Sequence, residues 1–449
     1  MTKYRTYIAM ILLGSLLCSC SSSPVVESTS SNFSAGSLQD ETSSMPEKKQ
    51  PVVLNGVAFE LVVPCDDNVY GSGNENGFYQ IITNTDGSHN VVFIDYKTCQ
   101  QIYLCADANC QHDNERCNSW FPADDTQIWP IACDDQIFFV HNSWVSTSYI
   151  EKANLDGSNR QKLYELENGG TVSSGAAYKA GYLAFMAEFY VTEKNSVSHK
   201  DCLLAVDTET GASTFIFESA SPKGSATDIG SVSAFFEGVT THGFIVKTIE
   251  TGETPDIQFH KVYEIPFDGG DIHEITSFQT GEMQGRPNGS AWYYLKSDET
   301  QQHLDLGYID SETGKDHTVV SELNKTIPTT SLGDVFIRNF VDEWIIINAL
   351  TSKALDENQN IELIFGCYAV NQNTGEILEL GLSNYYHVTQ VPIEIYDELG
   401  DELLVQASIS EAAPNSQTQI MTDLKYTLGI ISKKDYLASN PAYKLIDML

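Results

Sequence analysis

The segment 105–117 concentrates side chains that bind metals or form disulfide bonds. Its pattern is C-x4-C-x-H-x4-C, made by Cys105, Cys110, His112 and Cys117. Three thiolates and one imidazole suit a tetrahedral Zn²⁺ in softness and in number. The spacing matches no standard zinc knuckle or ribbon, so zinc at these four residues is the minor alternative. We expect disulfide bonds that pin the loop, no metal or other cofactor, and a surface position for His112.

The number of cysteines favours disulfide bonds. The chain has 10 cysteines, which is many for a protein of the cytosol. Two of them lie in the N-terminal leader described below, and the remaining even number fits pairing outside the cytosol. The sequence leaves open which cysteines pair. The predicted disulfide partners are Cys65, Cys99, Cys105, Cys110, Cys117, Cys133, Cys202 and Cys367.

Pairs of adjacent aspartates are the other candidate metal ligands, because Ca²⁺ prefers carboxylate oxygens. None of the pairs has the alternating spacing with a glycine that marks an EF-type loop. Aspartate is also common in hairpin turns, where it bonds its own backbone. We therefore predict turns and keep calcium as a minor alternative. The pairs are Asp66-Asp67, Asp124-Asp125 and Asp134-Asp135.

The elements that position these residues belong to a repeat. Its first marker is a short apolar strand, a tight turn, and a strand rich in aromatic and β-branched residues. Copies recur about every fifty residues, as the blades of a propeller do. The copies begin at Gly77, Asp135, Gly181, Gly243, Ser290, Glu343 and Asp401.

A second marker, a polar turn between two alternating strands, follows each copy. Glycine there supplies the positive φ of a tight hairpin, and Asp or Asn bonds its own backbone. The two markers alternate strictly, so each unit contains four strands. Seven such units with little helical periodicity predict an all-β fold, a seven-bladed β-propeller, with six or eight blades as alternative counts. The turns lie at 95–99, 154–158, 207–211, 267–270, 310–314, 371–375 and, in degenerate form, 432–435.

The turn sequences Asn-x-Asp-Gly-Ser and Asp-x-x-Thr-Gly resemble those of β-propellers of the low-density-lipoprotein-receptor and TolB-like class. The resemblance covers nearly all of 51–449 and implies the propeller fold. Lipid-anchored versions of such domains are bacterial surface proteins, common in Gram-positive gut bacteria. The chain lacks the Tyr-Trp-Thr-Asp motif of the receptor class, so receptor-type ligands are not implied.

The N-terminus carries an export signal. An apolar run at 7–17 follows two basic residues and is too short to span a bilayer. Leu17, Ser19 and Cys20 then resemble a bacterial lipobox, in which a leucine lies three residues before the modified cysteine. The resemblance implies that Cys20 is the site of lipid attachment.

This anchor sets the domain organisation. Residues 1–19 are the predicted lipoprotein signal peptide, and 20–50 are a disordered Ser-rich tether with too few apolar side chains to fold. Residues 51–449 form the predicted propeller, in which 52–64 is apolar enough for an extra strand that could close the ring. The acyl chains, such as palmitate, hold the protein at the extracytoplasmic face of the cell membrane without a transmembrane helix.

The net charge and the sequence motifs limit the functions that the chain can have. The net charge of −36 repels nucleic acid, which we exclude as a partner. Local signatures of enzymes, such as a nucleophile elbow or a phosphate loop, are absent. We expect a non-catalytic binding or scaffold protein for an unknown protein or glycan ligand. Trp120, Trp129 and Trp144 are either contact residues or buried. The alternatives are a polysaccharide hydrolase or lyase with channel carboxylates, and an accessory or sensing subunit of an envelope complex.

Overall fold

The computed structural model describes residues 58–65, 71–143, 145–179, 181–193, 196–219, 230–254, 257–355, 361–386, 389–411 and 424–449. All of them belong to one compact unit, Val53–Leu449. The predicted signal peptide, the predicted lipid-attachment residue Cys20 and the predicted tether lie outside the described residues. The same holds for Asp66, Asp67 and Trp144.

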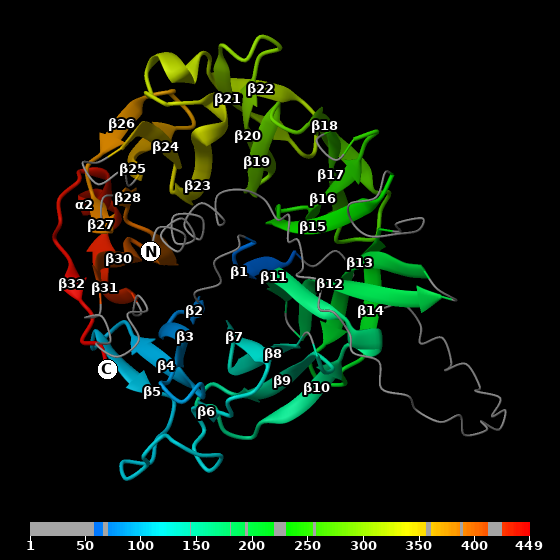
Figure 1. Cartoon of the computed structure of the whole chain (residues 1–449), viewed down its shortest axis with the longest axis vertical. Helices are drawn as coiled ribbons and strands as arrows, with labels where there is room; N and C mark the ends of the chain where they lie inside the picture. The colour runs from blue at the N-terminus through cyan, green and yellow to red at the C-terminus, as the bar shows by residue number, and fades with distance from the viewer. Residues whose placement is uncertain are drawn as a thin grey trace. The chain divides into compact units, whose positions relative to one another are not determined.

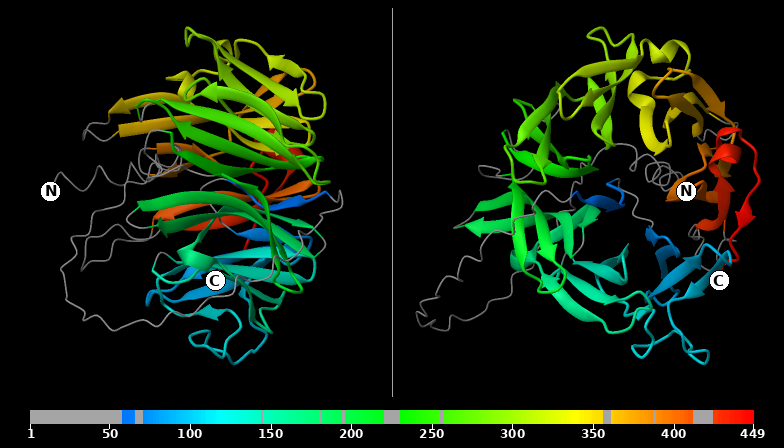
Figure 2. Two further views of the ribbon diagram at one scale, coloured as in Figure 1. Left: turned by 90° about the vertical axis from the view of Figure 1, so that its right-hand side faces the viewer. Right: turned by 180° about the vertical axis from the view of Figure 1, so that it is seen from behind.

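Seven sheets follow one another around a central axis and form a seven-bladed β-propeller (Figure 1). The first strand of each blade lies near the axis and the last lies at the outside, as the views in Figure 2 also show. The predicted all-β, seven-bladed fold with four-stranded blades is therefore confirmed.

The first four blades contain these strands, from the inside outwards. Blade 1 has β2 (Ser72–Asn74), β3 (Gly77–Thr83), β4 (His89–Asp95) and β5 (Gln100–Tyr103). Blade 2 has β7 (Thr126–Cys133), β8 (Gln136–Ser143), β9 (Tyr149–Asn154) and β10 (Gln161–Glu165). Blade 3 has β11 (Thr171–Lys179), β12 (Tyr182–Glu193), β13 (Ser196–Asp207) and β14 (Ser213–Glu218). Blade 4 has β15 (Val232–Val239), β16 (Gly243–Thr251), β17 (Gln258–Pro266) and β18 (His273–Gln279).

The other three blades complete the ring. Blade 5 has β19 (Met283–Asn288), β20 (Ala291–Ser297), β21 (Leu304–Asp310) and β22 (Asp316–Val320). Blade 6 has β23 (Val335–Val341), β24 (Trp344–Leu355), β25 (Ile361–Asn371) and β26 (Ile377–Leu380), with β27 (Ser383–Tyr386) and β28 (Thr389–Pro392) added beside β25. Blade 7 has β29 (Ile395–Leu399), β30 (Glu402–Glu411), β31 (Leu424–Ser432) and β32 (Lys444–Leu445).

Helix is scarce in the part of the chain that the structure describes. It consists of α2 (Lys433–Leu437) and three 3₁₀ turns, η1 (Glu167–Gly169), η2 (Leu323–Lys325) and η3 (Leu332–Asp334). None of the helices found in the described ranges has the length and apolar character needed to cross a membrane.

The two sequence markers fall at fixed places in the blades. The first marker locates the second strand of every blade, and the second marker locates the turn between the third and fourth strands. In the turn of blade 3, Asp207 Oδ1 accepts hydrogen bonds from the N–H groups of Glu209 (2.9 Å) and Thr210 (2.8 Å). Gly211 follows with φ +66°, the left-handed region that glycine adopts without strain. In blade 7, helix α2 follows the third strand, which explains the degenerate turn there.

The middle strands are apolar on both faces because each blade is covered by two neighbours. In β13, Leu203, Leu204 and Val206 are all 0% exposed. Leu204 and Val206 share a core with Phe138 of blade 2, whereas Leu203 shares one with Phe244 of blade 4. The core is therefore divided among the interfaces between blades, which stabilises the ring as a whole.

The predicted extra strand is present but does not close the ring. Within 52–64 the structure places β1 (Glu60–Val63), which pairs antiparallel with β11 of blade 3 on its axis side. β1 also contacts the innermost strands of blades 1, 2 and 4. The ring is instead joined by the C-terminal segment, where Gln101 N donates to Asp447 O (2.9 Å) and Asp447 N donates to Cys99 O (2.8 Å).

Candidate metal centre and blade 6–7 cavity

The cysteine–histidine segment interrupts the outer strand of blade 1. β5 pairs with one half of β4, and after the loop 104–119 the short strand β6 (Trp120–Phe121) pairs with the other half. Both ends of the loop bond the same residue, since Leu104 N donates to Val91 O (3.0 Å) and Val91 N donates to Ser119 O (2.8 Å). These two hydrogen bonds fix both ends of the loop on β4. The residues between the two ends depend on other contacts for their conformation.

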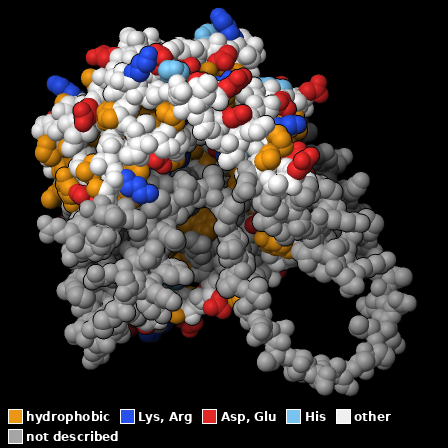
Figure 3. Space-filling view, turned by 45° about the horizontal axis from the view of Figure 1, so that its top comes forward, with side chains coloured by type: hydrophobic (Ala, Val, Ile, Leu, Met, Phe, Trp, Pro, Cys, Tyr) orange, Lys and Arg blue, Asp and Glu red, His pale blue; other side chains and the backbone are white. Residues whose placement is uncertain are grey.

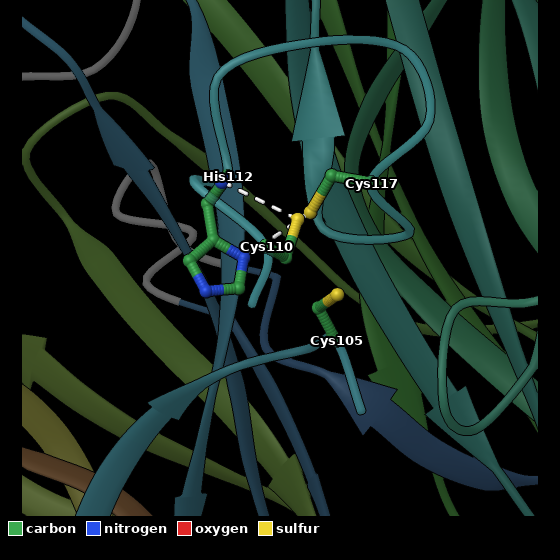
Figure 4. A group of neighbouring side chains, drawn as sticks. All are labelled: Cys105, Cys110, His112 and Cys117. Atoms are coloured by element: carbon green, nitrogen blue, oxygen red, sulfur yellow. Dashed lines mark hydrogen bonds between the residues drawn. The ribbon is translucent and has the colours of Figure 1, made fainter. Parts of the chain in front are cut away.

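Four potential ligand atoms meet inside this loop. The Sγ atoms of Cys105, Cys110 and Cys117 and a ring nitrogen of His112 all lie within 4.8 Å of one another (Figure 4). His112 Nδ1 is 3.2 Å from Cys117 Sγ. A Zn–S bond of about 2.3 Å in a tetrahedral site implies sulfur atoms roughly 3.8 Å apart. The spacing in the loop therefore fits a zinc ion at its centre with small adjustments.

Backbone turns and one aromatic ring hold the ligands. Asp107 Oδ1 accepts from Asn109 N (2.9 Å), in a turn that Cys110 N closes by donating to Asp107 O (3.0 Å). The N–H of His112 points at Cys110 Sγ (3.4 Å), and its own φ is +55°. Tyr103 stacks on the imidazole with ring centroids 4.1 Å apart. Such N–H···S contacts and ring stacking orient ligands from outside the coordination shell.

Neighbouring groups in the cluster shift the pKa values of Cys110 and Cys117. Burial opposes ionisation of Cys117, but hydrogen bonds from Ser119 and His112 outweigh it and lower the pKa to about 6. At Cys110 the N–H of His112 favours the thiolate, yet desolvation and the neighbouring thiols Cys117 and Cys105 raise the pKa to about 11. Adjacent thiols cannot all ionise without a compensating cation. A divalent metal ion bound by these residues would supply that charge.

The disulfide prediction finds no support in the structure, because no disulfide bond joins the cysteines of the described residues. Cys105, Cys110 and Cys117 converge together with His112, which is a member of the cluster rather than a mere surface residue. Cys367 lies buried near Tyr436 Oη (4.0 Å), in a core that contains no other cysteine. The remaining predicted partners, Cys65, Cys99, Cys133 and Cys202, lie outside the cluster.

The other candidate residues have structural surroundings. Asp124 Oδ1 accepts from Thr126 N (2.9 Å), and Asp134 lies in the β7–β8 turn with φ +47°. Trp129 is 8% exposed, so of its two alternatives, contact residue or buried residue, the structure shows burial. Trp120 is half-buried, and its Nε1 finds no acceptor among the described residues.

Sequence reasoning missed a cavity of about 50 Å³ between blades 6 and 7. Arg338 of β23, Asn348 of β24 and Glu394 in the link before β29 line it. Arg338 Nη2 lies 3.8 Å from Glu394 Oε1. Asn348 Oδ1 is buried and accepts no hydrogen bond from the described residues. No local motif could have signalled this group, because its members come from three separate strands or links.

No protein-family model and no curated protein sequence matches the chain. An oligogalacturonate lyase in complex with manganese has a similar structure, with 13% identity and a TM-score of 0.45 over 80% of this chain and 87% of the lyase. A puromycin-hydrolyzing peptidase of Mycobacterium tuberculosis is 10% identical with a TM-score of 0.45, over 90% of this chain and 56% of the peptidase. TolB of Acinetobacter baumannii is 13% identical with a TM-score of 0.31, over 81% of this chain and 77% of TolB.

These similarities show the fold of the chain. They also require a correction of the predicted function. TolB and the other matches are consistent with the TolB-like propeller inferred from the turn sequences. The lyase and the peptidase are enzymes, and they overturn the prediction of a non-catalytic binding or scaffold protein. The alternative, a propeller hydrolase or lyase, agrees with them better. At identities of 10 to 13% they do not assign a substrate or a metal to this chain.

Proposed function

We propose that this chain binds one Zn²⁺ through Cys105, Cys110, His112 and Cys117, in the propeller of a lipid-anchored extracytoplasmic protein. The observation that carries the proposal is the convergence of four ligand atoms within 4.8 Å of one another. Thiolate and imidazole are soft ligands that select zinc, whereas calcium requires oxygen ligands.

The proposed zinc is structural. Four protein ligands complete a tetrahedral shell and leave no position for a substrate. The loop that they close also contacts blade 2, where Asn118 Nδ2 donates to Asp156 O (3.4 Å) and Arg160 Nη1 donates to Trp120 O (3.2 Å). The Arg160 guanidinium lies 3.9 Å from the centroid of the Phe121 ring and interacts favourably with the Cys117 thiolate. The metal therefore stabilises the junction between blades 1 and 2.

Metal analysis of residues 21–449 tests this proposal. We expect one zinc per chain after purification without chelator, and three additional alkylatable thiols once the metal is removed. Cys117→Ser should lose the zinc, whereas Cys99→Ser, a change in the same blade outside the cluster, should keep it. A zinc-free protein in which Cys105, Cys110 and Cys117 resist alkylation until reduction would contradict the proposal.

A second candidate function is polysaccharide cleavage at the blade 6–7 cavity. Glu394 can transfer a proton as general acid or base, and Arg338, 3.8 Å away, can stabilise developing negative charge. Asn348 Oδ1 is a buried acceptor that a sugar hydroxyl would satisfy. A cavity of about 50 Å³ admits one substituent of a sugar rather than a whole ring, so the chain of the substrate lies outside it.

Two assays distinguish the reaction types: new reducing ends report hydrolysis, and ultraviolet absorbance of unsaturated sugar ends reports elimination. Glu394→Gln should lower the rate at least about 100-fold, the usual contribution of a general acid or base. Glu402→Gln is the matched control, because Glu402 forms an ion pair with Lys444 on another part of blade 7. Equal rates in the two variants would exclude Glu394 from the reaction.

The membrane anchor remains part of the proposal. The lipobox-like residues before Cys20 support lipid attachment there. Labelling cells with a palmitate analogue should mark the intact protein and leave Cys20→Ser unmarked. The variant should also be lost from the membrane fraction, whereas unchanged membrane retention would argue against the anchor.

A further inference from the structure

A groove of about 340 Å³ runs along one face of blade 4, beside the outer strand of blade 3. Its size falls in the range of small-molecule sites, which are mostly lined by apolar and aromatic side chains with a few polar groups. It shares no lining residue with the blade 6–7 cavity. Its lining includes Phe217, Thr248, Glu250, Phe259, Lys261 and Tyr263.

Strand register explains why these side chains share one face. Thr248 and Glu250 alternate along β16, and their partners on β17 are Lys261 and Phe259 respectively. Paired residues of adjacent strands point to the same side of a sheet. The opposite side of the blade is already covered, because Ile245 packs with Trp292 of blade 5.

The groove occupies one end of the face that blade 4 turns toward blade 3. Toward the other end of β16, Phe244 and Val246 of the same face are buried against blade 3. Farther out, Phe217 of β14 reaches Tyr263 with ring centroids 6.4 Å apart. Phe259 remains 41% exposed, which leaves an aromatic surface in contact with solvent.

Two charged side chains, Glu250 and Lys261, line the groove. Within the part of the chain that the structure describes, neither Glu250 nor Lys261 forms a salt bridge, although Lys247 and Glu237 of the same blade do so. One carboxylate and one ammonium therefore face the groove beside aromatic rings. Together they offer hydrogen-bond donors and acceptors with no net charge between them.

We propose that this groove binds a neutral oligosaccharide. Pyranose rings present C–H faces that pack on aromatic side chains such as Phe259 and Tyr263, while their hydroxyls bond carboxylate, ammonium and hydroxyl groups. Acidic glycans are disfavoured because the charges of Glu250 and Lys261 offset each other in the groove, while the chain as a whole carries a net charge of −36. The inference rests on the second candidate function and names its substrate class, with the groove holding the glycan away from the cavity that would cleave it.

Binding measurements test the groove separately from any reaction. The probes are hexasaccharides of cellulose, xylan, mannan and starch type, with oligogalacturonate as the acidic comparison. All titrations use residues 21–449 carrying Glu394→Gln, so that cleavage does not interfere. We expect at least one neutral hexasaccharide to bind, and Phe259→Ala to weaken it at least tenfold.

Two further variants keep the result interpretable. Lys261→Met should also weaken binding at least tenfold, and it guards against a folding defect in the first variant. Phe215→Ala removes another aromatic side chain of β14, 56% exposed and outside the groove lining, and should leave affinity unchanged. Absence of binding by every neutral probe, tighter binding of oligogalacturonate, or equal effects of Phe259→Ala and Phe215→Ala would overturn the inference. Binding of a neutral hexasaccharide without cleavage by the wild-type protein would overturn the second candidate function and the assignment of its substrate class, whereas cleavage without binding at the groove would overturn the groove alone.

Discussion

The cysteines of this chain divide into two kinds according to their surroundings. Burial raises the pKa of Cys202 and Cys367 to about 12, so they behave as small apolar side chains of the cores between blades. Cys117 is buried as well, but Ser119 Oγ lies 3.1 Å from its sulfur and His112 Nδ1 lies 3.2 Å away. A count of cysteines treats both kinds alike, so the sequence alone could not separate the cluster of Cys105, Cys110 and Cys117 from the cysteines of the cores.

His260 of blade 4 makes stability depend on pH. It is 8% exposed, Nε2 lies 2.7 Å from Thr280 Oγ1, and the ring stacks on Phe278. Burial, aided by Lys247, lowers its pKa to about 4. The folded state therefore resists a proton that the unfolded chain accepts below about pH 6.5. The contribution of neutral His260 is complete above that pH and is lost as the pH falls through 4.

We expect His260→Gln to remove this dependence. Between pH 7 and pH 4.5 the wild type should lose about 1–2 kcal/mol more unfolding free energy than the variant, after allowance for solvent screening. Urea unfolding at both pH values measures the difference. His303→Gln is the control, since His303 is a histidine with a side chain 42% exposed, beside Glu322. Parallel loss in wild type and His260→Gln would assign the acid sensitivity to other groups.

At the scale of strands, prediction succeeded where local chemistry repeats. Alternating apolar residues and Asp/Asn–Gly turns placed the second strand of each blade and the turn before the fourth, because both depend on residues close in sequence. The position of β1 in blade 3 was not predictable, since its partner Tyr178 is distant in sequence from Glu60. The cavity lined by Arg338 and Glu394 was not predictable either, because these two residues are distant in sequence and meet only in the folded ring.

Removal of zinc should loosen the loop 104–119 without unfolding the propeller. The loop contains a trypsin site at the exposed Arg116, next to the ligand Cys117. With metal bound, the fixed backbone resists the protease, whereas chelation should speed cleavage after Arg116 at least tenfold. Mass spectrometry of timed digests measures both rates. Lys97, exposed in a turn of the same blade, is the internal control and should be cut equally with and without metal.

The C-terminal segment 444–449 should stabilise the closed ring by joining blade 7 to blade 1. Ile446 is 3% exposed and packs with Phe78 and Ile94 of blade 1, so blades 1 and 7 are joined by side chains as well as by backbone hydrogen bonds. Deletion of 444–449 should cost at least about 3 kcal/mol, the range for losing one large buried aliphatic residue. Thermal unfolding measures the loss. A melting temperature unchanged by the deletion would show that the remaining blade interfaces suffice.

At the scale of the whole molecule, the dominant feature is charge. The chain has 61 acidic and 25 basic side chains, so acidic groups outnumber basic ones by 36. In the view of Figure 3, acidic side chains are scattered over the described surface and do not gather in one patch. Scattered like charges favour solubility and oppose compaction by mutual repulsion. The same field discourages anionic ligands, as the neutral-glycan inference requires.

Salt should therefore stabilise the protein. The Debye length falls from about 30 Å at 0.01 M to about 3 Å at 1 M salt, which screens the repulsion among unpaired carboxylates in the folded state. We expect the melting temperature at pH 7 to rise by several degrees between 0.01 M and 1 M NaCl. The rise should shrink at pH 4.5, where exposed carboxylates are partly neutral. A melting temperature that falls with salt at pH 7 would mean that the ion pairs, such as Lys433 with Asp342 (2.7 Å), outweigh the excess negative charge.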